Sequence, residues 1–180
     1  MHKTIYTIGH SNRELKDFIA LLEAYNVKTL VDIRSIKKSR HNPQFNEVSL
    51  GLALKKKGIK YVGIDELSGF RKTSKDSVNK ALKNPSFRGY ADYMLTAKFK
   101  EGIKKLERLS SKSSTAIMCA EALPWRCHRF LVSDYLAAND VKVVHILSDK
   151  STMEHKVSKM AIKKDGNLIY NANSSDLRDF

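Results

Sequence analysis

The order of apolar segments along the chain constrains its fold more than any other feature of the sequence. Short runs rich in β-branched residues alternate with longer segments whose apolar residues recur every three or four positions. This alternation is typical of βαβ units, in which helices join parallel strands. Five strands are predicted, over Thr4–Ile8, Thr29–Ile33, Lys60–Ile64, Thr115–Cys119 and Lys142–Ile146. We therefore predict an α/β fold with a mainly parallel central sheet flanked by helices, in a single domain over residues 1–180.

The segments between the strands predict helices because their apolar residues recur with the helical period. These helices are expected from a cap at Ser11 or Asn12 to about Tyr25, over Val48–Leu54, over Phe87–Leu109, and from Pro124 in a first turn to about Asn139. Gly58 is the residue expected just past the end of the second helix, although the spacing of Val48–Leu54 also fits a strand.

Two further segments predict turns and loops. Asp65–Ser86 is polar and rich in Ser, Lys and Gly, which indicates a long loop or lid. The alternative is that Asp76–Leu82 forms one more surface helix. Near the end of the chain, Asp165–Gly166 predicts a tight turn between Met160–Lys163 and Leu168–Tyr170, and hence a terminal hairpin.

Positive charge dominates the composition. The 33 Lys and Arg residues exceed the 19 Asp and Glu residues, for a net charge of +14. This balance favours anionic partners such as nucleic acid, nucleotides or an acidic surface. The alternative is that the lysines, which are spread along the chain, only solvate helix faces. No RNP-type motif or zinc-finger spacing is present, so specific readout of nucleic acid is not supported.

The sequence also indicates the cellular compartment in which the protein is expected. The chain begins without the apolar run of a signal peptide, and no stretch approaches the roughly 18 apolar residues of a membrane span. We therefore expect a cytoplasmic protein with no membrane contact. In a reducing cytosol its two cysteines, Cys119 and Cys127, are expected to be thiols or metal ligands instead of a disulfide.

Reactive side chains follow the predicted strands. Ligands of open parallel sheets bind outside the carboxyl ends of the strands. The residues at these ends are His10 and Ser11 after the first strand, Asp32, Arg34 and Arg40 at and beyond the second, and Cys119 and Glu121 at the fourth. Each has a structural explanation when taken alone, such as a loop cap at Asp32 or a helix cap at Ser11. Their joint placement favours a site at this edge of the sheet.

The segment from Cys119 to Arg129 is the most informative in the chain. Pro124 in the first turn of a helix places Cys127 near the helix amino end, where the dipole favours the thiolate. His128 and Arg129 add positive potential. Cys127 is therefore a candidate nucleophile, or the same helix end binds an anion such as phosphate or carboxylate. Glu121 would act as a general base, or hold an arginine.

Two arginines after the second strand allow a second anion-binding interpretation. Arg34 and Arg40 flank a basic segment, and a pair of guanidinium groups beside a helix amino end would hold a planar anion through bidentate hydrogen bonds. The alternative is that Arg34 forms a structural ion pair with Asp32 or Glu121. The two interpretations are compatible.

A metal site is the competing interpretation of the thiols. Cys119, Cys127, His128 and His10 are acceptable zinc ligands. Cys127 and His128 are adjacent on the predicted helix, so their side chains diverge by about 100° and do not readily share one ion. We therefore prefer the nucleophile and anion-binding interpretations and assign no metal ligands. Cys119 also has a simple structural explanation, because it closes an apolar strand.

The sequence resembles the DUF488 family along nearly its whole length. The matching motifs are Tyr6–Ser11, Asp32–Arg34 with Ser39, Arg40 and Phe45, Phe87 with Tyr90–Ala91, Cys119–Glu121, Cys127–Arg129, Glu154–His155 and Asp165–Tyr170. Lys37 departs from the usual proline, and Leu67–Gly69 replaces a Leu-Gly-Gly motif. The resemblance implies a shared polar site and supplies no reaction.

Three functions are compatible with these residues. The leading hypothesis is an enzyme that acts on a nucleotide, nucleic acid or other phosphate-bearing ligand. In it Arg34, Arg40 and Arg129 bind the anion with Ser11, and His10 with Asp32 positions or protonates the substrate. Cys127 or Glu121 supplies the nucleophile or base, with Cys119 and His128 as further candidate catalytic residues. The alternatives are a non-catalytic nucleotide or nucleic-acid binding module, and a metal-dependent protein that uses the two cysteines. No particular cofactor or oligomeric state is indicated.

Overall fold

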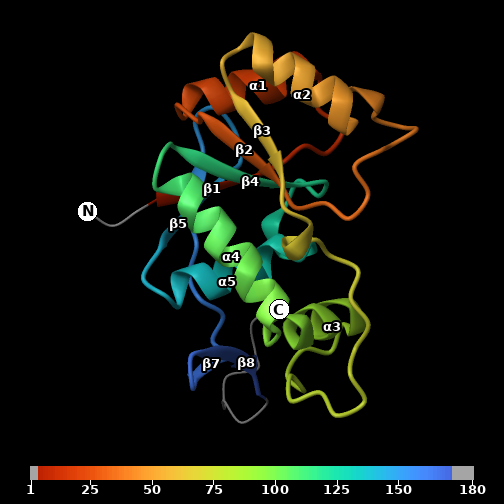
Figure 1. Cartoon of the computed structure of the whole chain (residues 1–180), viewed down its shortest axis with the longest axis vertical. Helices are drawn as coiled ribbons and strands as arrows, with labels where there is room; N and C mark the ends of the chain where they lie inside the picture. Colours follow the sequence, from red (N-terminus) through yellow and green to blue (C-terminus); the bar gives the residue numbers. More distant parts are fainter. Residues whose placement is uncertain (1–3, 172–180) are drawn as a thin grey trace.

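A six-stranded sheet forms the centre of the protein (Figure 1). The computed structural model describes residues 4–171. The strands lie in the order β3-β2-β4-β1-β5-β6, and all are parallel except β6, which pairs antiparallel with β5. Their bounds are Thr4–Gly9 (β1), Thr29–Asp32 (β2), Lys60–Gly63 (β3), Thr115–Cys119 (β4), Lys142–Ile146 (β5) and Thr152–Glu154 (β6). The five predicted strands and the α/β fold class are confirmed, and β6 was not predicted.

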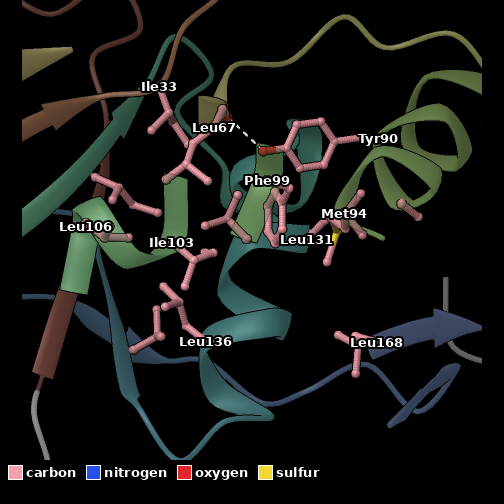
Figure 2. Packing of buried hydrophobic residues seen from close by; sticks show 14 of the residues in the cluster. Ile33, Leu67, Tyr90, Met94, Phe99, Ile103, Leu106, Leu131, Leu136 and Leu168 are labelled. Carbon is pink, nitrogen blue, oxygen red and sulfur yellow. Dashed lines mark hydrogen bonds between the residues drawn. The ribbon is translucent and has the colours of Figure 1, made fainter. Parts of the chain in front are cut away.

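Helices cover both faces of the sheet. On one face, α1 (Leu15–Ala24) and α2 (Glu47–Lys56) pack Phe18, Leu22 and Leu50 against Ile8 of β1. On the other face lie α3 (Pro85–Met94), α4 (Ala97–Ser110) and α5 (Arg129–Ala137), whose apolar residues form the larger cluster (Figure 2). The separation follows from the alternation of side chains along each strand, which sends neighbouring residues to opposite faces.

Two helix starts differ from the prediction. Neither Ser11 nor Asn12 caps α1; the cap position is Glu14, and Ser11 lies in a turn with φ 48°. Pro124 begins a short 3₁₀ helix, Pro124–Arg126, and α5 starts only at Arg129. Cys127 therefore has an extended backbone (φ −142°, ψ 167°) before the helix, not within it.

The long helix predicted over Phe87–Leu109 is in fact two helices. α3 ends at Met94 and α4 begins at Ala97, because the side chain of Thr96 accepts a hydrogen bond from the amide of Phe99 and caps the new helix. No proline or glycine marks the break, and apolar residues recur at helical spacing on both sides of it. Over Val48–Leu54 the helix was the correct alternative, since α2 spans it.

The loop after β3 is held against α3. A 3₁₀ turn, Asp65–Leu67, leads into a segment with no further helix before α3, so the surface helix over Asp76–Leu82 is absent. The Tyr90 hydroxyl donates to the carbonyl of Leu67 at 2.7 Å (Figure 2), and the guanidinium of Arg71 lies 3.9 Å from the ring centre of Tyr93. These contacts fix the loop over the carboxyl edge of the sheet.

The predicted terminal hairpin is present. β7 (Ala161–Lys164) pairs antiparallel with β8 (Asn167–Tyr170). Asp165 and Gly166 join them with positive φ values of 50° and 73°, as a two-residue hairpin turn requires. The buried ring of Tyr170 connects the hairpin to the larger apolar cluster.

The strand connections place a candidate ligand-binding crevice at β4. β4 continues into α5 on one face of the sheet, whereas its neighbours β1 and β2 continue into α1 and α2 on the other face. Crevices form where connections leave neighbouring strands in opposite directions.

Within residues 4–171, no helix is both long and apolar enough to cross a bilayer.

Candidate functional site

The carboxyl ends of β1 and β4 are joined closely by backbone contacts. The amide of His10 donates to the carbonyl of Cys119 at 3.1 Å, and the amide of Ser11 donates to that of Ala120 at 2.8 Å. A Cβ atom added to Gly9 would lie 1.8 Å from the carbonyl oxygen of Glu121. Glycine at position 9 therefore allows the loop after β4 to cross the end of β1, which brings His10 beside the thiol segment.

Asp32 and Arg34 form a buried, bidentate ion pair. The Nη2 and Nε atoms of Arg34 donate to the Asp32 carboxylate at 2.7 Å and 3.0 Å. The hydroxyl of Tyr61 donates to the same carboxylate at 2.6 Å, and Arg34 Nη2 also reaches the carbonyl of Phe45. Of the alternatives for Arg34, the structural pair with Asp32 is the one formed, and it fixes the end of β2.

His10 completes this cluster as a neutral ring. Its Nδ1 donates to the carbonyl of Ser11 at 2.8 Å, so its Nε2 accepts from Arg34 Nη1 at 3.1 Å. Burial, followed by the nearby guanidinium charges, lowers the pKa of His10, which agrees with this assignment. The ring stacks on Phe45 with centroids 4.4 Å apart. Both ring nitrogens are thus engaged, and His10 orients Arg34.

Ser11 and Arg40 lie at the margin of the cluster. The Ser11 hydroxyl is half-buried and contacts the Asn12 side chain at 3.4 Å. Arg40 is exposed in the loop before the 3₁₀ turn Pro43–Phe45, and it has no hydrogen bond or ion pair with a residue that the structure describes. The structure therefore does not bring Arg34 and Arg40 together as a pair of free guanidinium groups, and both remain predicted ligand-binding residues.

The two thiols and His128 gather at the end of β4. His128 Nε2 donates to the carbonyl of Ile33 at 3.0 Å, which leaves Nδ1 as an acceptor 4.0 Å from the Sγ atom of Cys119. The His128 ring lies against Tyr90, with centroids 4.7 Å apart, and beneath Gly69, where an added Cβ would meet Nδ1 at 2.7 Å. The loop after β3 thus covers His128, and the carbonyl of Ile33 holds its tautomer.

The environment of Cys127 favours its thiolate. A hydrogen bond from the Cys119 thiol is the largest cause that lowers the pKa of Cys127, to about 7, against the effect of burial. The guanidinium and the backbone N–H of Arg129 act in the same direction. The same thiol pair, together with burial, raises the pKa of Cys119. Of the two thiols, Cys127 therefore has the lower pKa.

Arg129 is the most unusual residue of the site. Its side chain is the largest that is fully buried, at 1% exposure. Nη2 donates to the carbonyls of Glu121 and Ala122, each at 3.2 Å. Nε and Nη1 are buried without a hydrogen-bond partner. A buried guanidinium with two unpartnered donor nitrogens is costly unless an acceptor reaches it, so Arg129 is a candidate anion-binding residue.

Glu121 lies between Arg129 and solvent. Its carbonyl accepts from Arg129, while its side chain is exposed and its carboxylate is near enough to oppose the pKa shift of Cys127. The carboxylate therefore does not hold the arginine, and the general-base role remains a prediction. Among residues 4–171, no group of three or more His, Cys, Asp or Glu side chains is arranged to hold a metal ion.

Comparison with protein families identifies the chain. The family described as "Domain of unknown function DUF488" matches residues 14–136. The protein belongs to the DUF488 family. The DUF488 match spans Asp32, Arg34, both cysteines and Arg129, whereas His10 precedes it. No curated protein and no solved structure matches the chain. Membership in the DUF488 family therefore supports the resemblance and leaves the reaction to the geometry.

Sequence reasoning missed two buried polar environments in this DUF488 protein. Tyr61, the third partner of Asp32, lies on β3 and had no motif around it. Asp134 anchors a buried chain of hydrogen bonds from α5: its carboxylate binds His155 at 2.8 Å, His155 binds His145 at 2.9 Å, and His145 binds Thr7 at 2.7 Å. The sequence did carry one signal for Asp134, because this acidic residue stands at a helix position where an apolar residue is expected.

Proposed function

We propose that the protein is an enzyme that acts on a small phosphate-bearing molecule, such as a nucleotide, with Cys127 as nucleophile and Arg129 as the anion-binding residue. The observation that carries this proposal is the pair of unpartnered, buried donors on Arg129. They belong to the first residue of α5, where the helix dipole also attracts negative charge. A phosphoryl oxygen would satisfy both donors.

The thiol next to this anion site gives it a chemical role. Cys127 lies two residues before Arg129, and its pKa of about 7 makes a large fraction of it thiolate near neutral pH. Positive charge around a thiolate both lowers its pKa and attracts an anionic substrate. A binding site alone does not need the lowered pKa, so the combination supports catalysis.

The burial of the site favours a small substrate over a polymer. Cys127 is 8% exposed and Arg129 is 1% exposed. A terminal phosphoryl group needs less opening of the structure to reach such residues than a nucleic acid duplex, whose backbone is too wide to reach them. The net charge of +14 then attracts the substrate at long range.

The proposed reaction has two steps. The Cys127 thiolate attacks phosphorus, the bond from phosphorus to the leaving oxygen breaks, and that oxygen takes a proton from solvent. A water that transfers its proton to the Glu121 carboxylate then attacks the cysteinyl phosphate. The sulfur–phosphorus bond breaks, and phosphate and the Cys127 thiolate are released. His10 and Asp32 position Arg34 and the edge of β1, and the His128 ring packs beside the Cys119 thiol, with Nδ1 4.0 Å from Sγ.

Turnover of a reactive aryl phosphate, p-nitrophenyl phosphate, tests these roles. We expect Cys127→Ser to abolish turnover and Glu121→Gln to slow it by about 10²-fold or more, because a general base is lost. Glu121→Gln should also accumulate a phosphoryl group on Cys127, which intact-mass spectrometry would detect. Full turnover in Cys127→Ser would exclude the nucleophilic role.

A non-catalytic nucleotide-binding module is the second candidate, because Arg129 would bind a phosphate equally well without turnover. The two candidates separate in the same assay. Tight binding of phosphate with no phosphoryl adduct in Glu121→Gln would favour the binding module. The salt dependence of nucleic acid binding would then be the next measurement.

A further inference from the structure

A cavity of about 480 Å³ lies beside the amino end of α5. Its walls come from the loop before α3, the start of α3, the 3₁₀ turn Pro124–Arg126, α5, the connection between β6 and β7, and β8. The described residues that line it do not include Cys119, Cys127 or Arg129. The volume lies in the range of small-molecule binding sites.

The cavity has an apolar, aromatic interior. Phe87, Trp125 and Phe130 supply aromatic rings from three different elements, and Leu131 and Met160 add aliphatic surface. Trp125 is 42% exposed, unusual for the largest apolar side chain, so its ring is available to a ligand. The hydroxyl of Tyr170, which also lines the cavity, is already bound to the carboxylate of Asp134 at 2.8 Å.

The charged residues of the cavity are of one sign. Lys83, Lys156 and Lys159 line it, and within the described part of the chain no acidic side chain does. Lys83 and Lys156 are exposed and have no ion-pair partner among residues 4–171. An apolar pocket whose charged groups are all cationic selects a ligand with an apolar body and a negative head group.

We propose that this cavity binds a small aromatic organic anion, at a site separate from Cys127 and Arg129. The rings of Phe87, Trp125 and Phe130 contact a flat aromatic body, and Lys83 and Lys156 contact its carboxylate, sulfonate or phosphate. A nucleobase fits less well, because the hydroxyl of Tyr170 already donates to Asp134 and Ser158 Oγ already accepts from the amide of Met160. The proposal does not depend on the reaction proposed for Cys127.

The single tryptophan makes the site directly measurable. The probe is 8-anilino-1-naphthalenesulfonate, an aromatic anion that accepts energy from tryptophan, and its neutral analogue is N-phenyl-1-naphthylamine. We expect saturable binding of one molecule of the sulfonate with quenching of Trp125. The double variant Lys83→Ala/Lys156→Ala should weaken binding about tenfold, toward the affinity of the neutral analogue. Competition by 1-naphthoate and by 1-naphthyl phosphate identifies the preferred head group.

Matched variants separate this site from other binding. Lys55→Ala/Lys56→Ala removes two lysines from α2, away from the cavity, and should leave the affinity unchanged. Cys127→Ser should also bind normally, which keeps this test independent of the proposed reaction. Equal affinity for the sulfonate and the neutral analogue would overturn the anionic head group. Unchanged probe fluorescence in Trp125→Leu, with circular dichroism showing a folded variant, would overturn the location.

Discussion

At the scale of single residues, the two thiols differ because each changes the proton affinity of the other. Cys119 keeps its proton and donates it, and Cys127 is the acceptor whose pKa falls to about 7. Removing the donor should therefore raise the pKa of Cys127. We expect Cys119→Ala to shift the midpoint of Cys127 alkylation by iodoacetamide to higher pH, as followed by peptide mass spectrometry.

Serine at position 119 is the matched control for this prediction. The Ser hydroxyl can still donate a hydrogen bond to Cys127, so Cys119→Ser should keep the midpoint closer to that of the parent protein. If Cys119→Ala and the parent share one midpoint, the thiol pair does not control the pKa, and the charge of Arg129 would be the remaining cause.

The structure brings most of the predicted site residues close together, but the sequence did not define their partners. His10, Asp32, Arg34, Cys127 and Arg129 were selected by residue type and by position after a strand. The pair of Arg34 with Asp32 was one of the alternatives, but the sequence could not select it, because pairing depends on distances across the sheet. The structure pairs Asp32 with Arg34 and leaves two donors of Arg129 unpartnered. Arg34 and Arg129 are the same residue type, but of the two only Arg129 has side-chain nitrogens free to bind a ligand.

At the scale of elements, two glycines inside helices differ in the space available for a side chain. A Cβ added to Gly51 in α2 would meet only the Tyr61 ring at 3.9 Å, whereas one added to Gly102 in α4 would lie 2.9 Å from atoms of Glu66 and Leu67. We expect Gly51→Ala to raise the free energy of unfolding by about 0.5–1 kcal/mol, because alanine is the better helix former. Gly102→Ala should lower it by about 1–3 kcal/mol through overpacking.

Urea unfolding followed by circular dichroism measures both changes. The two substitutions are chemically identical and each lies inside a helix, so their difference isolates the close packing of α4 against the turn Asp65–Leu67. Equal stability changes in the two variants would show that this packing is not as close as described.

The elements themselves were largely predictable, with errors at their ends. Strand positions followed from β-branched runs, and the hairpin followed from Asp165–Gly166. The break between α3 and α4 was not visible, because the apolar period continues through Thr96, whose capping hydrogen bond sets the new start. β6 is three residues long and lies at the sheet edge, so it carries too little apolar patterning to predict.

At the scale of the whole molecule, a buried chain of hydrogen bonds links the sheet, α5 and the hairpin. It runs from Thr7 through His145 and His155 to Asp134, which also accepts from the hydroxyl of Tyr170. Burial, followed by the nearby His155 and Arg129, lowers the pKa of His145 to about 3. His145 therefore stays neutral in the folded protein over most of the acid range.

This shift makes the stability of the protein depend on pH. Below the ordinary pKa of 6.5, His145 in the unfolded chain binds a proton that the folded protein does not accept until about pH 3. The free energy of unfolding should therefore fall by about 1.4 kcal/mol per pH unit per histidine as pH decreases through this range. His10, whose pKa is also lowered by burial, changes stability in the same direction.

Urea unfolding at several pH values between 7 and about 4 measures the slope. We expect His145→Gln to reduce it, because glutamine can bind Thr7 and His155 without titrating. His41→Gln, at an exposed histidine, is the matched control and should leave it unchanged. The same slope in His145→Gln as in the parent would contradict the low pKa of His145.

The central claim is that Cys127 is a thiolate beside an anion site formed by Arg129, and orthovanadate, a phosphate analogue, tests it most directly. The measurement is the rate of Cys127 alkylation by iodoacetamide with and without orthovanadate. We predict strong protection in the parent protein and in Arg126→Met, whose arginine is exposed, and loss of protection in Arg129→Met. Alkylation of Cys127 at the same rate with and without orthovanadate in the parent protein would contradict the claim.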